Sequence, residues 1–355
     1  MRVVETGRQI AVRAQEAKVA GISYVLPIAA TAPRTRQLTG YLLRLARELD
    51  DVIVVDGSPD AVFEAHTRAW GAHVRHVRPQ FHTPNGKVAG VVTGVQLSRY
   101  ERVVIGDDDI RYRRSELARL GDLLLGADVV RPQNWFRPAP WHARWDTART
   151  LFARLSGGDW PGTLGVRRSV LLAAGGYAGD VLFENLELVR TIKAGGGREM
   201  VPLDLFVVRR PPSFKHFSHQ RVRQAYDEWA RPLRLAATLA ILPGAIVLTS
   251  YRPRLLVVAA AASCGVAELG RRRAGGASVF PPSSALWAPL WLLERSITSW
   301  LALVAFLEGG VRYRGSRLQR SATSLRRLRS EHSRSRDGEA SVLAAAQGPP
   351  RPSLD

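Results

Sequence analysis

The chain has 355 residues, of which 46% are apolar and 23% are charged, a balance that supports at least one large buried core and excludes a wholly disordered protein. Its single cysteine, Cys264, excludes an intramolecular disulfide framework and suits a reducing compartment. The net charge of +20 favours anionic partners, which are phosphorylated ligands, acidic lipid headgroups or nucleic acid.

Residues 1–21 form an N-terminal extension without the features of a signal peptide. Charges are spread through MRVVETGRQIAVRAQEAKVAG, and no continuous apolar core is present. We therefore expect that the first domain is not exported and stays in the cytosol.

Short apolar runs alternate with helical patterns from residue 22 to about residue 210. The predicted strands are 22–28, 51–58, 73–79 and 102–106, and the predicted helices are 35–50, 60–71 and 88–100. Strands that alternate with helices predict an α/β fold with a mostly parallel sheet covered on both faces. Ligands of such folds bind at the carboxyl ends of the strands.

Acidic residues directly follow two of the predicted strands. Asp107, Asp108 and Asp109 follow RVVIG, and Asp56 lies at the end of DVIVVD. Adjacent carboxylates repel one another unless a cation lies among them, and their oxygens are the ligands that Mg²⁺ and Mn²⁺ prefer. The aspartates therefore predict a divalent metal that neutralises a diphosphate leaving group. Asp56 is either a ligand of the base or ribose, or a turn residue in DGSPD.

Several motifs, taken in order, resemble those of family 2 glycosyltransferases with the GT-A fold. They are YVLPI, DVIVVDGS, NGKVAGVVTG, VIGDDDIRY, GDWPGTLGVRRSVLLAAGGYAGDVLFENLEL and HQRVRQAYDEWARP, and they span residues 22 to 232. They look most like the membrane-associated branch that includes ceramide glucosyltransferase-like enzymes. The resemblance implies an inverting transfer of a sugar from a nucleotide donor, with a divalent metal.

The resemblance also implies which residues bind the donor. Asp56 resembles the family's nucleoside-binding aspartate, while Asn85 and Lys87 fall in the loop that approaches the nucleotide. A lysine beside a diphosphate is electrostatically favourable, although Lys87 could equally be a surface residue. In GDDDIRY, the first and last acids resemble the metal-binding DxD signature, so Asp107 and Asp109 are the predicted metal ligands. Asp108, between them, is placed on the donor side.

The segment FENLEL departs from the family at the position of the general base. Many relatives have Glu-Asp where this chain has Glu184 followed by Asn185, and an amide cannot take a proton from the acceptor hydroxyl. Glu184 or Glu187 takes that role, or the chain is catalytically impaired or uses different chemistry. We favour Glu184, because the other motifs of the site are intact. Glu187 is better explained as an ordinary acid in the first turn of a helix, where the helix dipole favours it.

HQRVRQ resembles the Q/RxxRW signature on an interfacial helix. Gln220 and Arg223 match it, and Gln224 replaces the tryptophan that contacts the acceptor. Arg223 is expected to bind the donor diphosphate with its planar guanidinium, and the same helix could also lie on lipid headgroups. Nearby, His216 and His219 are either metal ligands or packing residues, and we do not favour a metal role.

Three apolar runs follow, at residues 232–250, 254–270 and 285–307, each near the length that crosses a bilayer. Glu294 and Arg295 lie in the middle of the third run, where unpaired charges are costly. Three crossings would also place the arginine-rich tail outside the cell, against the positive-inside rule. We therefore expect two crossings and one interfacial or re-entrant segment.

The sequence thus predicts five regions and a function. The regions are the extension 1–21, a GT-A domain at 22–215, an interfacial helix at 216–232, a membrane region at 233–311, and a basic tail at 312–355 that is disordered from about residue 330.

The expected reaction moves a sugar from a nucleotide sugar, first of all a UDP-sugar, to a lipid or polyprenyl-linked acceptor. The expected location is the bacterial cytoplasmic membrane, with the catalytic domain facing the cytosol and no nucleic acid as partner. The alternatives are a GT-A-like sugar nucleotidyltransferase and a non-catalytic membrane protein that binds nucleotide sugars.

Overall fold

A seven-stranded sheet forms the centre of the N-terminal part of the chain in the computed structural model, which describes residues 18–34, 36–313 and 316–334. The strand order is β3-β2-β1-β4-β8-β6-β9. Neighbouring strands are parallel except where β8 pairs with β4 and with β6. The strands are β1 (Ile22–Ile28), β2 (Asp51–Asp56), β3 (Arg75–Val77), β4 (Arg102–Gly106), β6 (Val129–Val130), β8 (Thr163–Arg167) and β9 (Glu199–Met200).

Burial on both faces of the sheet explains the apolar runs in its sequence. All seven residues of β1 and all six of β2 are buried, as is usual for strands covered on both sides. Tyr24 and Leu26 pack into one core with residues of α2, whereas Val25 packs into a second core with residues of α4. The period-2 alternation of a strand thus separates two hydrophobic layers.

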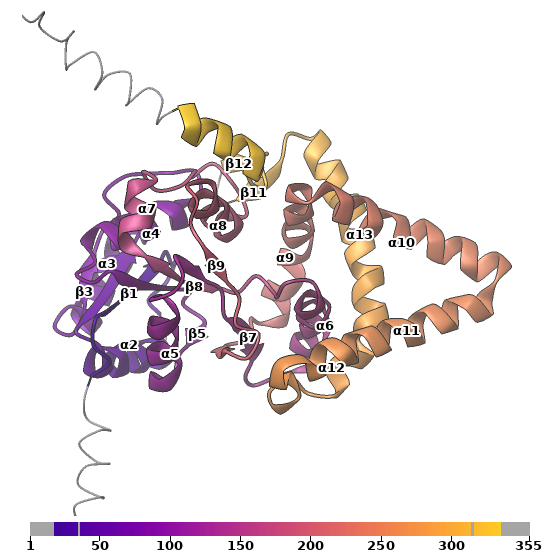
Figure 1. Ribbon diagram of the computed structural model, residues 1–355, viewed down its shortest axis with the longest axis horizontal. Coiled ribbons are helices and arrows are strands. Elements are labelled where there is room, and N and C mark those ends of the chain that lie inside the picture. The colour runs from indigo at the N-terminus through magenta and orange to yellow at the C-terminus, as the bar shows by residue number, and fades with distance from the viewer. Residues whose placement is uncertain (1–17, 35, 314–315, 335–355) are drawn as a thin grey trace, which may run out of the picture.

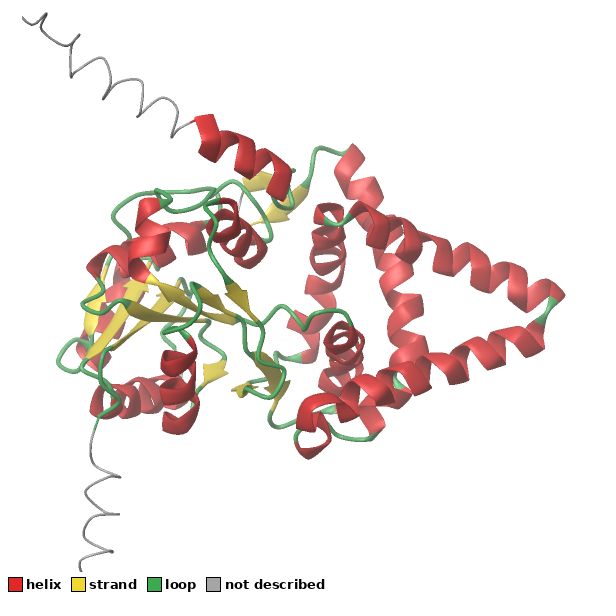
Figure 2. Ribbon diagram, in the orientation of Figure 1, coloured by secondary structure: helices red, strands yellow, loops and turns green. Residues whose placement is uncertain are grey.

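Helices cover both faces of this sheet (Figures 1 and 2). Their bounds are α2 (Arg36–Glu48), α3 (Asp60–Trp70), α4 (Gly86–Leu97), α5 (Arg114–Leu123), α7 (Arg168–Ala173) and α8 (Glu184–Ala194). Helix α6 (Trp141–Leu155) instead packs among the C-terminal helices. A smaller sheet has the order β5-β10-β7, with β5 (Ile110–Arg111), β7 (Gln133–Phe136) and β10 (Phe206–Arg209).

Helix α4 lies unusually close to the sheet because two of its glycines face it. A Cβ added at Gly94 would lie 2.2 Å from Cγ1 of Val25, and one added at Gly90 would lie 2.9 Å from Cβ of Pro27. The close approach brings the first turn of α4 to the carboxyl ends of β1 and β2.

The C-terminal part is almost entirely helical. It contains α9 (Phe214–Tyr226), η1 (Asp227–Ala230), α10 (Pro232–Tyr251), α11 (Pro253–Arg272), η2 (Arg273–Ser278), α12 (Ser283–Leu286), α13 (Ala288–Leu307), β11 (Val311–Tyr313) and β12 (Ser316–Leu318). Helices α10 and α11 form a hairpin that projects from the rest of the molecule, and α13 lies across its base (Figure 1).

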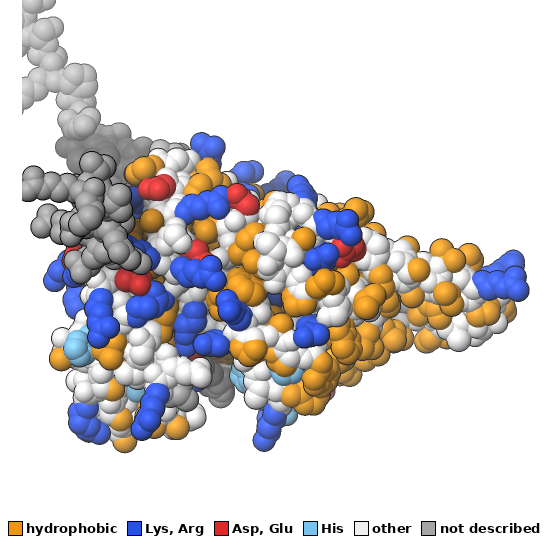
Figure 3. Space-filling view, turned by 90° about the horizontal axis from the view of Figure 1, so that it is seen from below, with side chains coloured by type: hydrophobic (Ala, Val, Ile, Leu, Met, Phe, Trp, Pro, Cys, Tyr) orange, Lys and Arg blue, Asp and Glu red, His pale blue; other side chains and the backbone are white. Residues whose placement is uncertain are grey.

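Three helical segments of this region are long and apolar enough to cross a membrane: Pro232–Tyr251, Pro253–Ser278 and Ala288–Leu307. Apolar side chains gather over the projecting hairpin, and basic side chains lie at its tip (Figure 3). The exposed apolar residues include Ile246, Val257 and Trp300. A surface of this kind is compatible with a membrane segment.

The predicted fold class is confirmed, since a mostly parallel sheet with helices on both faces is followed by a helical region with apolar segments. The predicted strand at 73–79 is shorter, at Arg75–Val77. Residues 325–334 are helical, so the expected disorder from residue 330 does not hold for 330–334. Most of the N-terminal extension and the last part of the tail, residues 1–17 and 335–355, lie outside the described residues.

Candidate functional site

A cavity of about 900 Å³ lies between the carboxyl ends of the strands and the helical region. Its lining includes Asp107 and Gly57 at the strand ends, Lys87 on α4, Arg223 on α9 and Arg295 on α13. This volume is at the upper end of the range found for small-molecule pockets. Most of the predicted site residues line it, namely Lys87, Asp107, Asp108, Asp109, Glu184, Gln220 and Arg223.

Each aspartate of the acid cluster (Asp107, Asp108 and Asp109) has its own basic partner. Oδ1 of Asp107 lies 2.6 Å from Nζ of Lys87, and Oδ2 of Asp109 lies 2.8 Å from Nε of Arg209. Asp108 forms an ion pair with Arg34, which lies between β1 and α2. The three partners come from different parts of the chain, which explains how adjacent carboxylates are tolerated.

Asp109 has the most unusual environment of the three. Burial raises the pKa of its carboxyl above the ordinary value, Arg209 lowers it, and the neighbouring Asp107 raises it again. Oδ1 of Asp109 is buried and has no hydrogen-bond partner among the described residues. Such an oxygen beside other carboxylates is suited to a cation.

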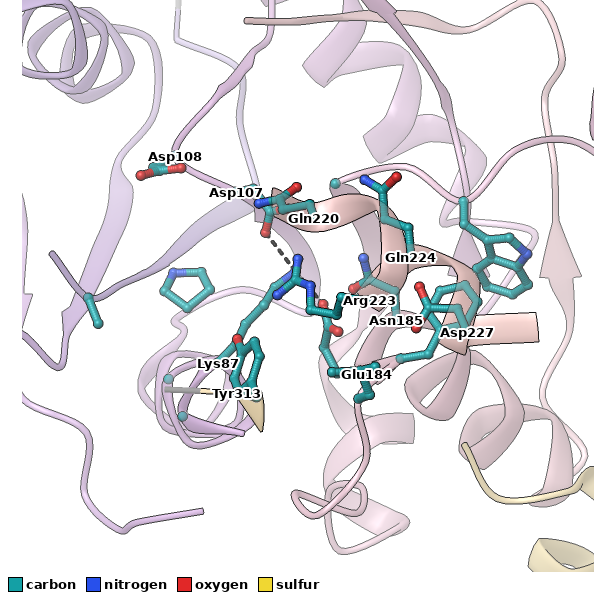
Figure 4. Close-up of a pocket in the computed structure, with 18 of the residues that line it drawn as sticks. Lys87, Asp107, Asp108, Glu184, Asn185, Gln220, Arg223, Gln224, Asp227 and Tyr313 are labelled. Atoms are coloured by element: carbon teal, nitrogen blue, oxygen red, sulfur yellow. Dashed lines mark hydrogen bonds and ion pairs between the residues drawn. The ribbon is translucent and has the colours of Figure 1, made fainter. Parts of the chain in front are cut away.

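Lys87 links the acid cluster to Glu184 on α8. Its Nζ lies 2.6 Å from Oδ1 of Asp107 and 2.6 Å from Oε1 of Glu184 (Figure 4). Burial lowers the pKa of Lys87, but the two carboxylates more than offset this effect and hold the pKa above its ordinary value. Lys87 is therefore a fixed positive charge between two carboxylates.

Asn85 positions this lysine and does not itself line the cavity. Its Oδ1 accepts a hydrogen bond from the backbone N–H of Lys87 at 3.3 Å and so caps α4, and its Nδ2 donates to the carbonyl of Val181 at 2.9 Å. Asn85 is buried. Asn85 therefore joins α4 to the segment before α8.

The first turn of α8 carries Glu184 and Asn185 into the cavity. Nδ2 of Asn185 donates to the carbonyl of Pro161 at 2.9 Å. Glu187 points elsewhere: it is fully buried, and its Oε2 accepts from the backbone N–H of Thr323 at 2.6 Å. Of the two acids weighed from the sequence as the base, only Glu184 lines the cavity.

Helix α9 contributes the far wall of the cavity. Gln220 lies beside His216 of the same helix, and the guanidinium of Arg223 lies 5.4 Å from the centre of the Tyr313 ring. Arg223 forms no ion pair with the residues that the structure describes. Gln224 also lines the cavity, and its Oε1 accepts from Arg221 at 2.9 Å.

Asp227 is a cavity carboxylate that the sequence patterns did not single out. Burial raises the pKa of Asp227, Arg223 lowers it and Glu184 raises it, and the resulting pKa is about 7. It follows Arg223 by four residues and Gln220 by seven, so helical periodicity places all three on one face. That spacing was the signal in the sequence that could have identified it.

Asp56 is placed differently from the other predicted donor residues, because it does not line the cavity. Its Oδ2 lies 2.7 Å from Nδ1 of His66 and 3.1 Å from Nε2 of His76, and its Oδ1 accepts from the N–H of Ser58 at 2.9 Å. Burial raises the pKa of Asp56, and these hydrogen bonds together lower it below its ordinary value. Its predicted nucleoside contact stays a prediction.

The ligand atoms of Asp56, His66 and His76 lie close enough together to hold a metal ion. However, Nε2 of His66 already accepts the N–H of Arg34 at 2.9 Å, and Nδ1 of His76 lies 2.9 Å from Oγ1 of Thr67. A ring nitrogen that accepts a backbone N–H fixes the neutral tautomer of His66, so its Nδ1–H donates to Asp56. Asp56, His66 and His76 therefore form a hydrogen-bonded network with Arg34 and Thr67.

No protein-family model matches the sequence, and no curated protein is significantly similar to it. Solved structures that resemble it include a mannosyltransferase from Pyrobaculum calidifontis in complex with GDP-Man and Mn²⁺, which is 19% identical, with a TM-score of 0.49 over 80% of this chain and 89% of that chain.

Two further neighbours have lower scores. Glucosyl-3-phosphoglycerate synthase of M. tuberculosis is 22% identical with a TM-score of 0.38, over 62% of this chain and 82% of that chain. S. aureus TarS 1-349 in complex with UDP-GlcNAc is 14% identical with a TM-score of 0.38, over 56% of this chain and 60% of that chain. The sugar nucleotides and Mn²⁺ bound in these structures are ligands of those proteins. Similarity at these identities and TM-scores does not extend the ligands to this chain.

Proposed function

We propose that this protein is an inverting GT-A glycosyltransferase that moves a sugar from a nucleotide-sugar donor to a membrane-associated acceptor. The observation that carries the proposal is the row Asp107, Lys87 and Glu184, joined by two ion pairs of 2.6 Å inside one cavity. It puts an acid cluster suited to a diphosphate and its metal next to a carboxylate that can take a proton.

The acid cluster has the chemistry to hold Mg²⁺ or Mn²⁺. Oδ1 of Asp109 is buried without a partner among the described residues, and Oδ2 of Asp107 faces Gly162, where an added Cβ would lie only 2.7 Å from it. Asp107 and Asp109 would be the ligands, and a bound ion would neutralise charge on the departing diphosphate. Asp108, paired with Arg34, belongs to the donor side.

Basic side chains supply the rest of the charge that the donor needs. Lys87 carries a fixed positive charge beside Asp107, and Arg223 lines the cavity with no carboxylate partner among the described residues. A guanidinium can bind a diphosphate through two parallel hydrogen bonds. Gln220, on the same face of α9, is placed to orient the sugar or the acceptor. We expect a UDP-sugar as the donor.

The reaction is a single displacement. The acceptor hydroxyl oxygen bonds to the anomeric carbon, the bond from that carbon to the diphosphate breaks, and a carboxylate takes the hydroxyl proton. We assign this base to Glu184, which the ion pair with Lys87 orients in the cavity. Asp227 is the second candidate, since its pKa of about 7 suits proton transfer near neutral pH.

The acceptor is proposed to be a lipid or polyprenyl-linked molecule. Helices α9 and α13 both line the cavity, and α13 presents exposed apolar side chains such as Leu293 and Ile297 on its outer side. A cavity wall shared with a lipid-facing helix lets such an acceptor react without leaving the bilayer. We place the protein in the bacterial cytoplasmic membrane with the cavity on the cytosolic side.

The test is a transfer assay with the detergent-solubilised full chain, a panel of nucleotide sugars, Mg²⁺ or Mn²⁺, and extracted lipids. We expect transfer from one donor, with losses of about 100-fold or more for Asp109→Asn and Glu184→Gln. The control is Glu64→Gln, which changes an exposed carboxylate on α3. Full activity of both site variants would overturn the assignment.

One observation favours a second function, that of a non-catalytic protein that binds nucleotide sugars. Asn185 stands where relatives have the base, and Glu184 is already paired with Lys87. Binding of a nucleoside diphosphate without hydrolysis or transfer of any donor in the panel would support this second function.

A further inference from the structure

Helix α13 carries two adjacent charges in its apolar sequence, and they do not pair with each other. Nε of Arg221 donates a hydrogen bond to Oε1 of Glu294 at 3.1 Å, and Nη1 of Arg221 donates to Oδ1 of Asp146 at 2.7 Å. Glu294 is therefore neutralised by Arg221, a residue of α9. Arg295 is left without that carboxylate.

Arg295 is a buried cation with no partner among the described residues. Arg295 is almost fully buried, with 2% exposed, and within the part of the chain that the structure describes neither its Nε nor its Nη1 has a hydrogen-bond acceptor. Its guanidinium lies 5.5 Å from the ring of Trp291, which offers only a weak cation–π contact. A buried charge that lacks a counter-ion is strongly unfavourable. Because Arg295 lines the cavity, an anionic ligand there can supply the missing partner.

Two other arginines line the cavity near Arg295, and together the three form what we call the arginine cluster: Arg231, Arg234 and Arg295. Two carboxylates accompany them. Oε2 of Glu228 lies 3.4 Å from Arg231 and 3.1 Å from Arg234, and Asp227 lies within electrostatic range of Arg223, Arg231 and Arg295. Three positive charges against two carboxylates leave an excess of one positive charge.

This end of the cavity differs from the donor end. The acid cluster and Lys87 lie at the strand ends, whereas Arg231 and Arg234 follow α9 and Arg295 is on α13. The charged residues that act on Arg295 include Arg221, Glu294, Glu228, Arg149, Asp146 and Asp227, and none of these belongs to the acid cluster. A single cavity thus offers one anion site by the strands and another beside the apolar helices.

The arginine cluster lies one helix away from the apolar surface. On α13, Arg295 and Ser299 are buried toward the protein, while Leu293, Ile297 and Leu301 are exposed on the outer side. A molecule with an apolar tail along this surface can place its polar head in the cavity.

We propose that the arginine cluster binds a phosphate group of the acceptor lipid, with Arg295 as its central ligand. The proposal rests on the proposed function, because it names the class of acceptor for that cavity. Guanidinium groups bind phosphate through paired, charge-assisted hydrogen bonds, and several of them around one cavity favour phosphate over a neutral headgroup.

The test measures the melting temperature of the full chain in detergent with three probes at equal concentration: dioctanoyl phosphatidic acid, dioctanoylglycerol and inorganic phosphate. We expect phosphatidic acid at tenfold excess over its Kd to raise the melting temperature of the native protein by about 2 °C. The shift should be absent for Arg295→Met, reduced at least by half for Arg295→Lys, and unchanged for the control Arg254→Gln at the exposed hairpin tip.

Other outcomes overturn the proposal. An equal shift in Arg295→Met, or no shift in the native protein, removes Arg295 as a phosphate ligand. An equal shift from dioctanoylglycerol shows that the tails bind and the phosphate does not, and an equal shift from inorganic phosphate shows a free-phosphate site in place of a lipid site. If Arg295→Met does not fold, undiminished affinity in Arg295→Lys overturns the central role of Arg295.

A parallel arm with UDP or GDP and Mn²⁺ separates this proposal from the proposed function. Binding at the acid cluster should persist in Arg295→Met. A protein that binds phosphatidic acid through Arg295 and no nucleoside diphosphate would retain the anion site while losing the glycosyltransferase assignment.

Discussion

Lys87 is the residue that joins the acid cluster to Glu184, through one ion pair with Asp107 and one with Glu184. Without its charge, the carboxylates of Asp107 and Glu184 would face each other across a partly buried space. Removal of one partner from a buried ion pair leaves an uncompensated charge and is destabilising.

We expect Lys87→Met to lower the free energy of unfolding by about 2 kcal/mol in the absence of metal, because its ion-pair partners are 15–23% exposed. Mn²⁺ should restore part of this stability, because a cation at Asp107 replaces the lost positive charge. Mn²⁺ should therefore raise the melting temperature of Lys87→Met more than that of the native protein. Lys18→Met, at a surface ion pair, is the control and should cost less than about 1 kcal/mol. A smaller Mn²⁺ effect in Lys87→Met than in the native protein would contradict this account.

The pKa of Asp227, raised from its ordinary 3.8 to about 7, predicts a pH dependence of stability. Between pH about 4 and about 7, the folded protein holds a proton on Asp227 that the unfolded chain has released. Asp227 therefore contributes stability at low pH that is lost as the pH rises toward 7. Asp227→Asn should have a higher melting temperature than the native protein at pH 8, and the difference should shrink at pH 5. An equal difference at both pH values would show that Asp227 does not titrate in this range.

The same residue gives a test of which carboxylate is the base. With Glu184 as the base, Glu184→Gln should lose about 10²–10⁴-fold in kcat, whereas Asp227→Asn should keep most of its kcat at pH 8. The reverse result, together with an acid limb of kcat/KM near pH 7 in Glu184→Gln, would transfer the role to Asp227.

Among the elements, α4 decides where Lys87 lies. Its two sheet-facing glycines allow the helix to pack against β1, and Asn85 fixes its first turn. The apolar run VAGVVTGV predicts a buried helix, but only the packing of Gly94 on Val25 sets its distance from the sheet.

Gly94→Ala should therefore destabilise the protein by about 1–3 kcal/mol, because the added Cβ would lie 2.2 Å from Cγ1 of Val25. Gly40→Ala is the matched control, since it is also inside a helix and nothing lies within 4 Å of its added Cβ. That variant should gain about 0.5–1 kcal/mol from helix propensity. Thermal or denaturant unfolding measures both, and equal effects of the two substitutions would disprove the close packing of α4.

At the scale of the whole molecule, the apolar hairpin projects away from the sheet, and basic residues mark its tip (Figure 3). Each arm has about 20 residues, long enough for about 30 Å of bilayer. Helix α13 packs along α6 and α9 at the base of the hairpin, which supports an interfacial position for the third segment.

This arrangement predicts the hairpin tip outside the cell and the basic tail inside. In a Cys264→Ser background, Arg252→Cys should react with a membrane-impermeant maleimide in intact cells, while Ser330→Cys should react only after lysis. Labelling of both positions in intact cells would show that α13 also crosses the membrane.

Much of the fold follows from local sequence. The runs ISYVLPI and DVIVVD identify buried strands because every residue is apolar or satisfied within the sheet, and the period of two separates the two cores. The three apolar segments and the aspartates behind β4 are likewise visible in the sequence, since they depend on run length and on position at the end of a strand. The limits of strands and helices differ by a few residues from the predicted ones, because packing and caps set these limits.

The partners of the charged residues were decided only by the tertiary structure. Lys87 and Glu184 are 97 residues apart, Asp56 turns to His66 and His76, and Arg221 takes the carboxylate next to Arg295. An ion pair depends on a few ångströms of separation between elements distant in the chain, which no local pattern encodes. The sequence by itself therefore determined which residue types lie at the strand ends and which segments are apolar. The packing of α4, α8, α9 and α13 around one cavity determined which of the charges face it.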